Sequence, residues 1–514
     1  MEVIQSLEPI AVPTIKPIHR ALAWLGVAAW CVIVFFGCLR LYTRHNDFKI
    51  GFHPDEYSKA RQLQQDYRNY NHPLLLLEAT NWLMTWRNTP HDLKSIVYTG
   101  REASAIIAAV GVVGFALAGY FAADSVGMVL TSLAVGLCPS LLVYSHYMKE
   151  DAALIGGIGV TVAGMALVWR KRTIVAQLLG PMLAGAGAAL AASGKYVGAV
   201  ASVGALASVI AAPWRRWYWI FIRLLLAAAM AYFVVKAINH RAFEHWADFE
   251  EGFDNEYKHG TTGHTGMMLD PPTAFIWNVA RIETQPHVQV FAVALLLAIV
   301  SRRRGWGWDL LLLLFTLCWL AVLSYTAIPF HRYGLPVVVL AHALAGLGAA
   351  RWIEQLRPRR NYWIAVSVLA IALFAGLQGY RCRDFLNQFA DDSRTRLRAW
   401  AKTNITRQTR FVQDSYADLP DNAWDNNVYY AAQNGSLDRL RRNGYTFVVV
   451  CDTNYSRYFV PGAHGEPGHT DQFRDRKAWY EKLFAEGKLV WQSKPDHPTY
   501  SFTNPEIRVY DLRK

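Results

Sequence analysis

Adjacent carboxylates occur at the start of a polar segment that follows the first long apolar run. Asp55 and Glu56 come directly after His53 and Pro54 in the sequence FHPDEY. A carboxylate placed near a membrane surface can act as a general base or hold a cation. Two acids at the start of a helix are also common because they interact favourably with the helix N-terminus, and Pro54 suits that entry. The spacing alone leaves both interpretations open.

A second acidic pair, Glu150 and Asp151, lies in the segment SHYMKEDAAL, between two apolar runs. Ionisable residues at the boundary of a membrane span are costly unless they reach water or a partner. His146 and Lys149 lie in the same segment, so the four residues predict a polar cavity. The alternative is a local ion pair between Lys149 and one of the acids.

Three basic residues stand at the predicted outer ends of apolar runs, where the bias of basic residues towards cytoplasmic loops would not place them. They are Arg101 in YTGREASA, Lys195 in AASGKYVG and Arg332 in PFHRYGLP. A phosphate at the outer leaflet would explain them, because Arg and Lys are natural phosphate partners. Each one alone could instead extend to lipid headgroups.

Histidines and cysteines give weaker signals. Five histidines lie close together in the chain: His240, His245, His259, His264 and His287. They lack the spacing of an HExxH motif, so we interpret them as solvated, with contact of His259 or His264 to substrate as the alternative. The six cysteines form no CxxC pair, which argues against a disulfide framework or a thiolate metal site.

Composition points to a membrane protein. Of the 514 residues, 53% are hydrophobic and 18% are charged, and the mean hydropathy is +0.12. Soluble proteins carry about 25% charged residues. The net charge of +13 comes from short basic clusters between apolar runs, so a nucleic-acid-binding patch is not predicted.

Apolar runs of membrane-spanning length predict about eleven transmembrane helices. They are 21–39, 103–122, 127–146, 152–169, 174–193, 197–212, 218–237, 287–301, 309–327, 335–350 and 361–379. The first run has no obvious signal-peptide cleavage site and is interpreted as a retained span. Basic clusters fall on one side if the N-terminus is cytoplasmic, and only the turn near Asp124 lacks them. The Gly- and Ala-rich stretch 154–208 predicts close helix packing.

This orientation places the polar regions 44–100, 239–286 and 381–514 outside the cytoplasm. The predicted fold is a mainly α membrane domain, 1–380, followed by a soluble α/β domain, 381–514. Within the tail, helix patterns cover Asp391–Lys402 and Arg474–Glu486, and β-rich runs cover Tyr445–Cys451 and Ile507–Leu512.

The motifs, taken in order, resemble the GT-C class of membrane glycosyltransferases that use polyprenyl-phosphate sugars. The nearest branches are the protein O-mannosyltransferases and the lipid A aminoarabinose transferases. The matching segments are HPDE with NYNHPLLL, GREASAI, SHYMKEDAAL, SGKYVGAV, HRYGLPVVVLAHALAG and DDSRTRLRAWAKTNI. They cover most of the chain and share one membrane side. The charge at Glu150, beside Lys149, departs from the usual pattern of the class.

The resemblance implies a glycosyltransferase in which Asp55, next to Glu56, is the catalytic carboxylate. It implies that Arg101, Lys195 and Arg332 bind the lipid phosphate. His53, His146, Lys149, Glu150 and Asp151 would line the acceptor side or the polar cavity.

The expected partners are a polyprenyl-phosphate sugar, the lipid bilayer, and a protein, lipid or glycan acceptor. The sequence identifies no cofactor, and the two acidic pairs leave open whether a divalent cation is bound. The predicted location is the prokaryotic plasma membrane. The alternative function is a lipid or sugar transporter or flippase, which would favour charges at the bilayer midplane and repeated halves.

Overall fold

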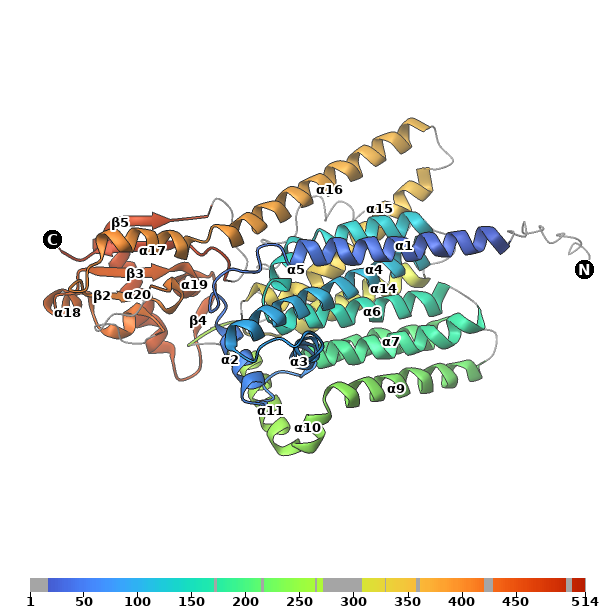
Figure 1. The fold of residues 1–514 in the computed structure, drawn as a ribbon, viewed down its shortest axis with the longest axis horizontal. Coiled ribbons are helices and arrows are strands. Elements are labelled where there is room, and N and C mark those ends of the chain that lie inside the picture. Colours follow the sequence, from blue (N-terminus) through green and yellow to red (C-terminus); the bar gives the residue numbers. More distant parts are fainter. Residues whose placement is uncertain are drawn as a thin grey trace, which may run out of the picture.

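The computed structural model describes residues 17–170, 173–213, 217–263, 266–270, 307–328, 330–356, 361–419, 429–495 and 502–513. A bundle of long helices forms one part of the molecule, and the strands of the C-terminal segment lie beyond one end of that bundle (Figure 1). Helix α1 (Pro17–Tyr42) begins at the opposite end of the molecule.

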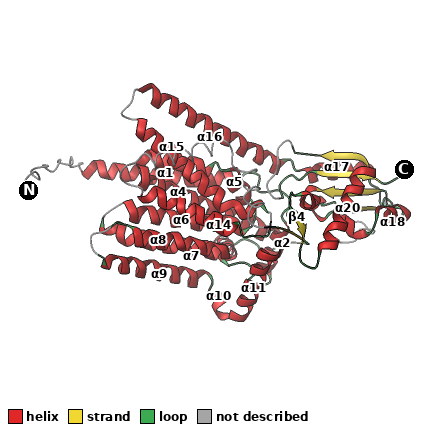
Figure 2. Cartoon of the chain, turned by 180° about the vertical axis from the view of Figure 1, so that it is seen from behind, coloured by secondary structure: helices red, strands yellow, loops and turns green. Residues whose placement is uncertain are grey.

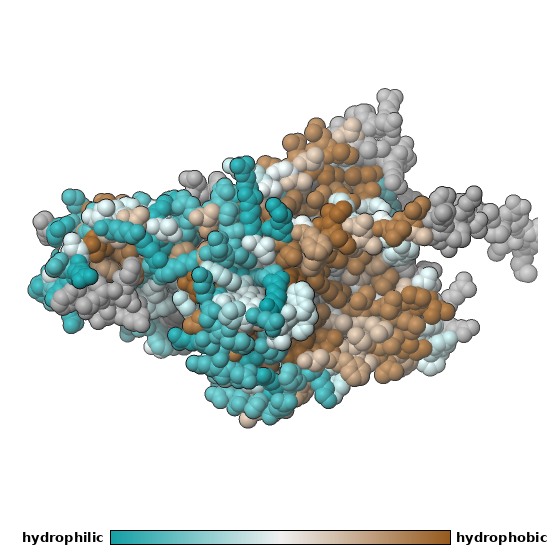
Figure 3. All heavy atoms as spheres, viewed as in Figure 1, coloured by the Kyte–Doolittle hydropathy of each residue, from teal (hydrophilic) through white to brown (hydrophobic). Residues whose placement is uncertain are grey.

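The bundle is built from apolar helices that run side by side (Figures 1 and 2). Its elements are α1 (Pro17–Tyr42), α4 (Leu93–Gly136), α5 (Pro139–Ser145), α6 (Glu150–Arg170), α7 (Ile174–Gly194), η1 (Tyr196–Val200), α8 (Ala201–Ala211), α9 (Tyr218–Ile238), α14 (Gly307–Leu323), α15 (Leu335–Leu356) and α16 (Asn361–Ala390). Hydrophobic residues dominate the visible surface of this part, whereas the C-terminal part is largely hydrophilic (Figure 3). The chain is therefore an integral membrane protein by composition and arrangement.

Six helices in the described ranges are long and apolar enough to cross a membrane. They are Ala21–Tyr42, Leu93–Gly136, Glu150–Trp169, Ile174–Gly194, Tyr218–Ile238 and His331–Gln355. The predicted spans 197–212 and 309–327 fall on shorter apolar helices, Tyr196–Ala211 and Gly307–Leu323. The predicted span 361–379 lies in α16, and the span 287–301 lies outside the described residues. The total of eleven spans stays a prediction.

The turn predicted near Asp124 is present inside α4. Ala123 and Asp124 have non-helical backbone angles, with φ of −146° and +54°. A Cβ atom on Gly119 would lie 2.3 Å from the carbonyl oxygen of Gly127, although eight residues of straight helix span about 12 Å. The chain thus reverses here, and α4 contains two antiparallel arms rather than one long helix.

Close packing of the Gly- and Ala-rich helices is as predicted. An ideal Cβ on Gly157 of α6 would lie 2.1 Å from the backbone nitrogen of Ala191 in α7. Only glycine permits this approach of two backbones.

The elements of the two polar loop segments, within residues 44–92 and 239–270, gather at the end of the bundle that faces the C-terminal segment (Figure 1). They are α2 (Pro54–Gln64), α3 (Leu75–Arg87), α10 (His240–Glu244), α11 (Trp246–Thr262) and the strand β1 (Met267–Leu269). Strand β1 pairs in antiparallel fashion with β4 (Ala463–Gly465), so the loop after α11 is joined directly to the C-terminal segment.

The C-terminal segment contains a four-stranded sheet in the order β2-β3-β6-β5. The strands are β2 (Phe411–Gln413), β3 (Phe447–Cys451), β6 (Ile507–Asp511) and β5 (Lys488–Ser493). Strand β2 is parallel to β3, and the other pairs are antiparallel. Its helices include α17 (Ser393–Asn404), α18 (Leu437–Arg442), α19 (Asp452–Tyr455) and α20 (Thr470–Glu486), with short 3₁₀ helices η3 (Ser415–Ala417), η4 (Ala431–Asn434) and η5 (Ser456–Phe459).

Strand β3 is buried on both faces, as its unbroken apolar run predicts. Val448 and Val450 pack into one cluster, whereas Phe447, Val449 and Cys451 pack into another. The four secondary-structure patterns predicted in the tail correspond to α17, α20, β3 and β6.

Candidate active site

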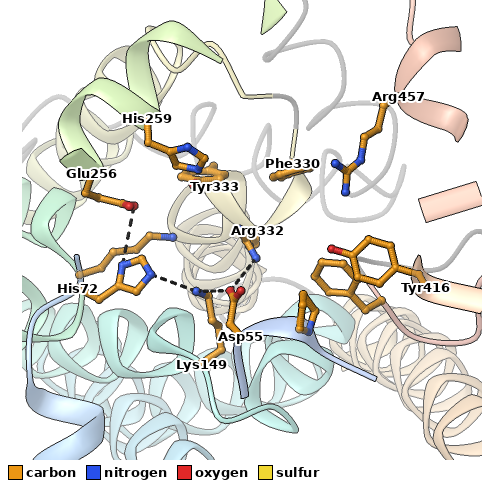
Figure 4. Close-up of a pocket in the computed structure, with 13 residues that line it drawn as sticks. Asp55, His72, Lys149, Glu256, His259, Phe330, Arg332, Tyr333, Tyr416 and Arg457 are labelled. Atoms are coloured by element: carbon orange, nitrogen blue, oxygen red, sulfur yellow. Dashed lines mark hydrogen bonds and ion pairs between the residues drawn. The ribbon is translucent and has the colours of Figure 1, made fainter. Parts of the chain in front are cut away.

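A pocket of about 130 Å³ lies where the helical bundle, the polar loop segments and the C-terminal segment meet (Figure 4). It is lined by Pro54, Asp55, His72, Lys149, Lys195, Glu256, His259, Phe330, Arg332, Tyr333, Tyr416, Arg457 and Phe502. Four predicted site residues, Asp55, Lys149, Lys195 and Arg332, are thus brought together although they are far apart in the sequence.

Asp55 stands in the first turn of α2. Pro54 occupies the first position of this helix, and His53 caps it by accepting a hydrogen bond from the Asp55 backbone N–H at 3.3 Å. This local geometry is the predicted Pro-fixed helix start. The Asp55 side chain is 35% exposed and faces the pocket, so its carboxylate can reach a ligand there (Figure 4).

Two cations hold the Asp55 carboxylate in the pocket. Its Oδ2 atom lies 2.7 Å from Lys149 Nζ and 3.7 Å from Arg332 Nη1. Burial raises the pKa of Asp55, but the positive charges of Lys149 and Arg332 outweigh burial and keep this pKa well below its usual range. Asp55 is therefore ionised at neutral pH.

Glu56 has a different environment although it is the next residue. Its side chain is fully buried, and its two carboxylate oxygens accept hydrogen bonds from Nε and Nη2 of Arg101 at 2.8 and 2.7 Å. Arg101 Nη1 also donates to the carbonyl oxygens of Asn46 and Phe48. The structure thus places Glu56 and Arg101 outside the pocket, in a pair that fixes α2 on α4.

The second acidic pair lies beneath the pocket, in ion pairs with lysines. Glu150 is paired with Lys59 and, at 3.1 Å, with Lys149. Asp151 Oδ1 lies 2.8 Å from Lys195 Nζ. Both acids are buried at the start of α6. The predicted local ion pair of Lys149 with Glu150 is present. Of the four residues predicted to form a polar cavity, Lys149 lines the pocket, whereas His146, Glu150 and Asp151 do not.

Lys195 and Arg332 share one aromatic wall of the pocket. The Lys195 ammonium lies 4.4 Å from the centre of the Tyr333 ring, and the Arg332 guanidinium lies 5.6 Å from it. Lys195 occupies the break between α7 and η1, and Arg332 lies in the 3₁₀ helix η2 (His331–Gly334) that precedes α15. Such breaks place charged side chains at helix ends, where a phosphate can approach them.

His53 and His146 do not line the pocket. The His53 ring is buried between Tyr147 and Phe502, and burial lowers its pKa to about 3. His146 is buried after α5, where its two ring nitrogens lie 2.7 and 3.0 Å from the carbonyl oxygens of Leu142 and Arg44. Both histidines support the polar loop segment that carries Asp55.

Nine of the thirteen lining residues are not among the predicted site residues, and six of these nine come from two regions. His72, Glu256 and His259 come from the polar loop segments, and Tyr416, Arg457 and Phe502 come from the C-terminal segment. Of these, only His259 was considered as a substrate contact, whereas His264 lies outside the described residues. A usable signal was the placement of Glu256 and His259 three residues apart, which puts them on one side of a helix.

Arg394 connects the C-terminal segment to the loop that bears Asp55. This buried residue pairs with Asp392 and donates to the carbonyl oxygens of Phe52, at 3.1 Å, and Phe502, at 2.7 Å. Its guanidinium also lies 3.7 Å from the centre of the Phe52 ring. The backbone immediately before His53 is therefore held from the C-terminal side. Arg394 lies in the DDSRTRLRAW motif of the sequence.

The charges in the pocket fit an anion better than a metal cation. Four cationic side chains, Lys149, Lys195, Arg332 and Arg457, line it together with two carboxylates, Asp55 and Glu256. Asp55, Glu150 and Asp151 already have lysine partners. In the part of the chain that the structure describes, no group of three or more His, Cys, Asp or Glu residues is arranged to hold a metal ion. The donor set therefore does not match a divalent cation, which needs several free oxygen ligands.

A second, larger cavity of about 670 Å³ adjoins the pocket and shares His72, Lys195, Glu256 and Tyr333 with it. Most of its remaining lining is apolar or aromatic: Tyr196, Val197, Phe253, Tyr257, Gly260, Thr261, Ala321, Val322, Leu323, Tyr325 and Thr326. Tyr257 and Tyr325 are largely exposed, so this apolar groove reaches the surface of the molecule.

Two solved membrane enzymes have a similar fold. ArnT from Cupriavidus metallidurans, solved bound to undecaprenyl phosphate, aligns with 96% of this chain and 98% of its own, at 14% sequence identity and a TM-score of 0.51. The Archaeoglobus fulgidus oligosaccharyltransferase, tethered with an acceptor peptide containing an NVT sequon, aligns with 92% of this chain and 74% of its own, at 12% identity and a TM-score of 0.50.

No protein-family model and no curated protein matches the sequence. At such low identities the likeness concerns the fold. The chain has the fold of the GT-C glycosyltransferases, as the sequence resemblance predicts.

Proposed function

We propose that this protein transfers a sugar from a polyprenyl-phosphate carrier to an acceptor. The observation that supports this function best is the juxtaposition of the two cavities. A cationic pocket containing Asp55 opens beside an apolar groove that reaches the molecular surface. A lipid-phosphate sugar has the same two parts, because its tail is apolar and its head is anionic.

The binding mode follows from this match. The polyprenyl chain lies in the apolar groove, between α11 and α14, and its phosphate contacts Lys195 and Arg332. The ArnT structure with a similar fold is bound to undecaprenyl phosphate, which supports a lipid phosphate as the ligand class here. Burial of apolar surface stabilises the bound tail by about 25 cal/mol per Å², and charge-assisted hydrogen bonds orient the phosphate.

Asp55 serves as the general base in the proposed reaction. An acceptor hydroxyl or amine attacks the anomeric carbon, and Asp55 takes the proton as the new bond forms. The bond between that carbon and the phosphate oxygen breaks, and its electron pair leaves with the polyprenyl phosphate. Lys195 and Arg332 stabilise the charge that develops on this leaving group. A single displacement inverts the anomeric configuration, and no step uses a metal ion.

The orientation proposed from the sequence places the pocket outside the cytoplasm. The N-terminus is then cytoplasmic, the membrane is the prokaryotic plasma membrane, and residues 381–514 form an extracytoplasmic α/β domain. An impermeant thiol reagent applied to intact cells should label a cysteine placed at exposed Ser436 but not one placed in the 301–306 loop. The reverse labelling pattern would invert the orientation.

Transfer itself is tested with purified protein, labelled polyprenyl-phosphate sugars and cell-envelope extract. Label should appear on an acceptor together with free polyprenyl phosphate, and Asp55→Asn should lower the rate of formation of both products by about 10²–10⁴-fold. Movement of the labelled lipid across reconstituted vesicles, without release of polyprenyl phosphate, would instead support the flippase alternative.

A further inference from the structure

Glu256 stands at the junction of the pocket and the apolar groove, and it lines both. It ends a series of contacts that begins at Asp55 and passes through Lys149 and His72 (Figure 4). The successive distances are 2.7, 3.4 and 3.9 Å. Glu256 therefore faces Asp55 from the opposite wall of the pocket, at the point where a lipid head group must enter it.

Among the described residues, every neighbouring acid has a Lys or Arg partner, whereas the Glu256 carboxylate has none. Asp55, Glu56, Glu150 and Asp151 each form an ion pair with lysine or arginine. Among the described residues, Glu256 has only His72 within ion-pair distance. Burial, followed by the charges of Lys149 and Lys59, lowers the pKa of His72 well below its usual value, so its imidazole is neutral. A carboxylate in a pocket that lacks a cationic partner must be satisfied by water or by a ligand.

The backbone of α11 holds Glu256 firmly in this position. Gly252, one turn earlier on the same side of the helix, touches the preceding polar loop segment, because a Cβ there would lie 2.5 Å from the carbonyl carbon of Tyr70. Gly260, one turn later, accepts a hydrogen bond from the Ala327 N–H at 3.1 Å. Residues 252, 256 and 260 thus form one docked edge of α11. Such fixed placement is what recognition of a polar group requires.

We propose that Glu256 recognises the sugar of the lipid-linked donor by accepting hydrogen bonds from its hydroxyl groups. This inference rests on the proposed function and adds a specificity-determining residue to it. The cations on the Asp55 side bind the phosphate, whereas Glu256 binds the sugar on the α11 side. The ligand class is therefore a polyprenyl-phosphate pentose or hexose with free hydroxyls directed towards α11. A carboxylate can accept from two adjacent hydroxyls at once.

The test compares binding of two probes, undecaprenyl phosphate and undecaprenyl-phosphate sugars, to the full-length protein in detergent. In the wild type, one or more of the pentosyl or hexosyl lipids should bind more tightly than undecaprenyl phosphate alone. Glu256→Gln should weaken binding of that sugar lipid by about ten- to a hundredfold, the usual effect of losing charge-assisted hydrogen bonds. Its affinity for undecaprenyl phosphate should stay within about twofold, since no phosphate contact is lost.

Two further variants separate recognition from folding. Glu251→Gln removes the same charge from an exposed position of α11 and should leave both affinities unchanged. Glu256→Asp keeps the carboxylate but draws it back by one methylene group, and it should reduce only the affinity for the sugar lipid. A sugar lipid in which the contacting hydroxyl is replaced by hydrogen should bind equally to the wild-type protein and to Glu256→Gln.

The outcomes are distinguishable. Equal loss of affinity for both lipids in Glu256→Gln, or no loss for either, would overturn the inference while leaving lipid-phosphate binding intact. Failure of the wild type to bind either lipid would overturn the proposed function, and the assignment of Glu256 with it.

Discussion

Arg332 and Arg351 stand near opposite ends of one helical segment, and their surroundings differ sharply. Arg351 is buried, with Nε and Nη2 bonded to Asp309 at 2.9 and 3.1 Å, Nη2 also bonded to the carbonyl oxygen of Ala122, and Nη1 bonded to Glu354. Arg332 has one carboxylate, Asp55, at 3.7 Å, and among the described residues its buried Nε has no hydrogen-bond partner. About 19 residues of helix, or roughly 28 Å, separate the two sites.

The contrast shows which buried charges are available for chemistry. At Arg351 every nitrogen has an acceptor, so this residue fixes α14, α15 and the reversal of α4 to one another. The Arg332 guanidinium faces a cavity, and it has a hydrogen-bond donor that no acceptor uses. An unused donor beside a cavity is expected at a site that binds an anion. Burial alone therefore does not identify function, whereas incomplete pairing beside a cavity does.

The same contrast, between an incompletely paired and a fully paired charge, distinguishes Asp55 from Glu56. Substitution of Asp55 gives the largest expected effect, a loss of turnover. Asn has nearly the shape of Asp but cannot accept a proton, so Asp55→Asn should lower turnover by about 10²–10⁴-fold. Its thermal stability should fall less than that of Glu56→Gln, because the Asp55 carboxylate is partly exposed and Lys149 keeps Glu150 as a partner. Glu56→Gln should instead lower stability, since Arg101 would stay buried without its full counter-charge.

Measurement of transfer rate and melting temperature on both variants separates the two roles. Near-normal transfer by Asp55→Asn, with a severe loss of turnover but not of stability in Glu56→Gln, would reverse the assignment. Full activity in both variants would exclude this loop from the chemistry.

The two arginines give the next prediction. Arg351→Met leaves Asp309 buried without its partner and should reduce the free energy of unfolding by about 3–5 kcal/mol. Arg332→Met should weaken binding of undecaprenyl phosphate by about one to two decades, the loss of one charge-assisted contact. Denaturant or thermal unfolding and lipid-binding measurements on both variants check this.

A double variant provides the control for the stability effect. Replacing both members of the buried pair, Arg351→Met with Asp309→Leu, should recover part of the lost stability, because no uncompensated charge is left. If Arg351→Met weakens lipid-phosphate binding as much as Arg332→Met does, the distinction between the two ends of α15 is wrong.

Sequence reasoning found the part of the site that is encoded locally. HPDE is contiguous, and its Pro54 and Asp55 form the start of α2 as the spacing predicts. The role of Glu56 could not be inferred from the sequence, because Arg101 lies 45 residues away and only the packing of α2 on α4 brings the two residues together. The contribution of Arg457 was equally hidden, since the C-terminal segment reaches the pocket only through tertiary contacts.

The turn near Asp124 shows another tertiary contact that the sequence hides. It has no basic residues of its own, yet Arg351 of α15 donates a hydrogen bond to the carbonyl oxygen of Ala122 there. The two residues are 229 positions apart in the chain. Counting basic residues loop by loop cannot detect this contact.

Arg394 tests how strongly the C-terminal segment controls the site. Arg394→Lys keeps the charge but loses the planar guanidinium group, which donates hydrogen bonds to Asp392 and to the carbonyl oxygens of Phe52 and Phe502. The loop bearing Asp55 should then be less well positioned, lowering kcat by about tenfold. Binding of undecaprenyl phosphate should be unchanged, because Lys195 and Arg332 are untouched.

The control is Arg396→Lys, two residues away on the same helix and 40% exposed, which should have wild-type kcat. Loss of lipid binding in parallel with kcat in Arg394→Lys would indicate a general structural defect rather than positioning of Asp55.

The smallest expected effect is a shift in the pH dependence of transfer. Lys149 and Arg332 keep the pKa of Asp55 well below its usual range, so Asp55 stays ionised as pH falls from 7 to 5. When folding lowers the pKa of a carboxyl, its ionised form stabilises the fold at pH values above the unfolded-state pKa of about 3.9. This stabilisation is lost as the pH falls through the folded-state pKa. Protonation of Asp55 should therefore not reduce the wild-type rate above about pH 4.

Lys149→Met removes the ammonium 2.7 Å from Asp55 and leaves Arg332, at 3.7 Å, as its nearest ion-pair partner. The acid limb of the rate profile should then move to higher pH by about one unit or more, since a close opposite charge typically changes a carboxyl pKa by about 1–3. Lys258→Met, which removes an exposed lysine paired with Asp254, should leave the profile unchanged. An identical acid limb in wild type and Lys149→Met would mean that Lys149 does not set the ionisation of Asp55, and a limb absent from both would mean that Asp55 does not act as the base.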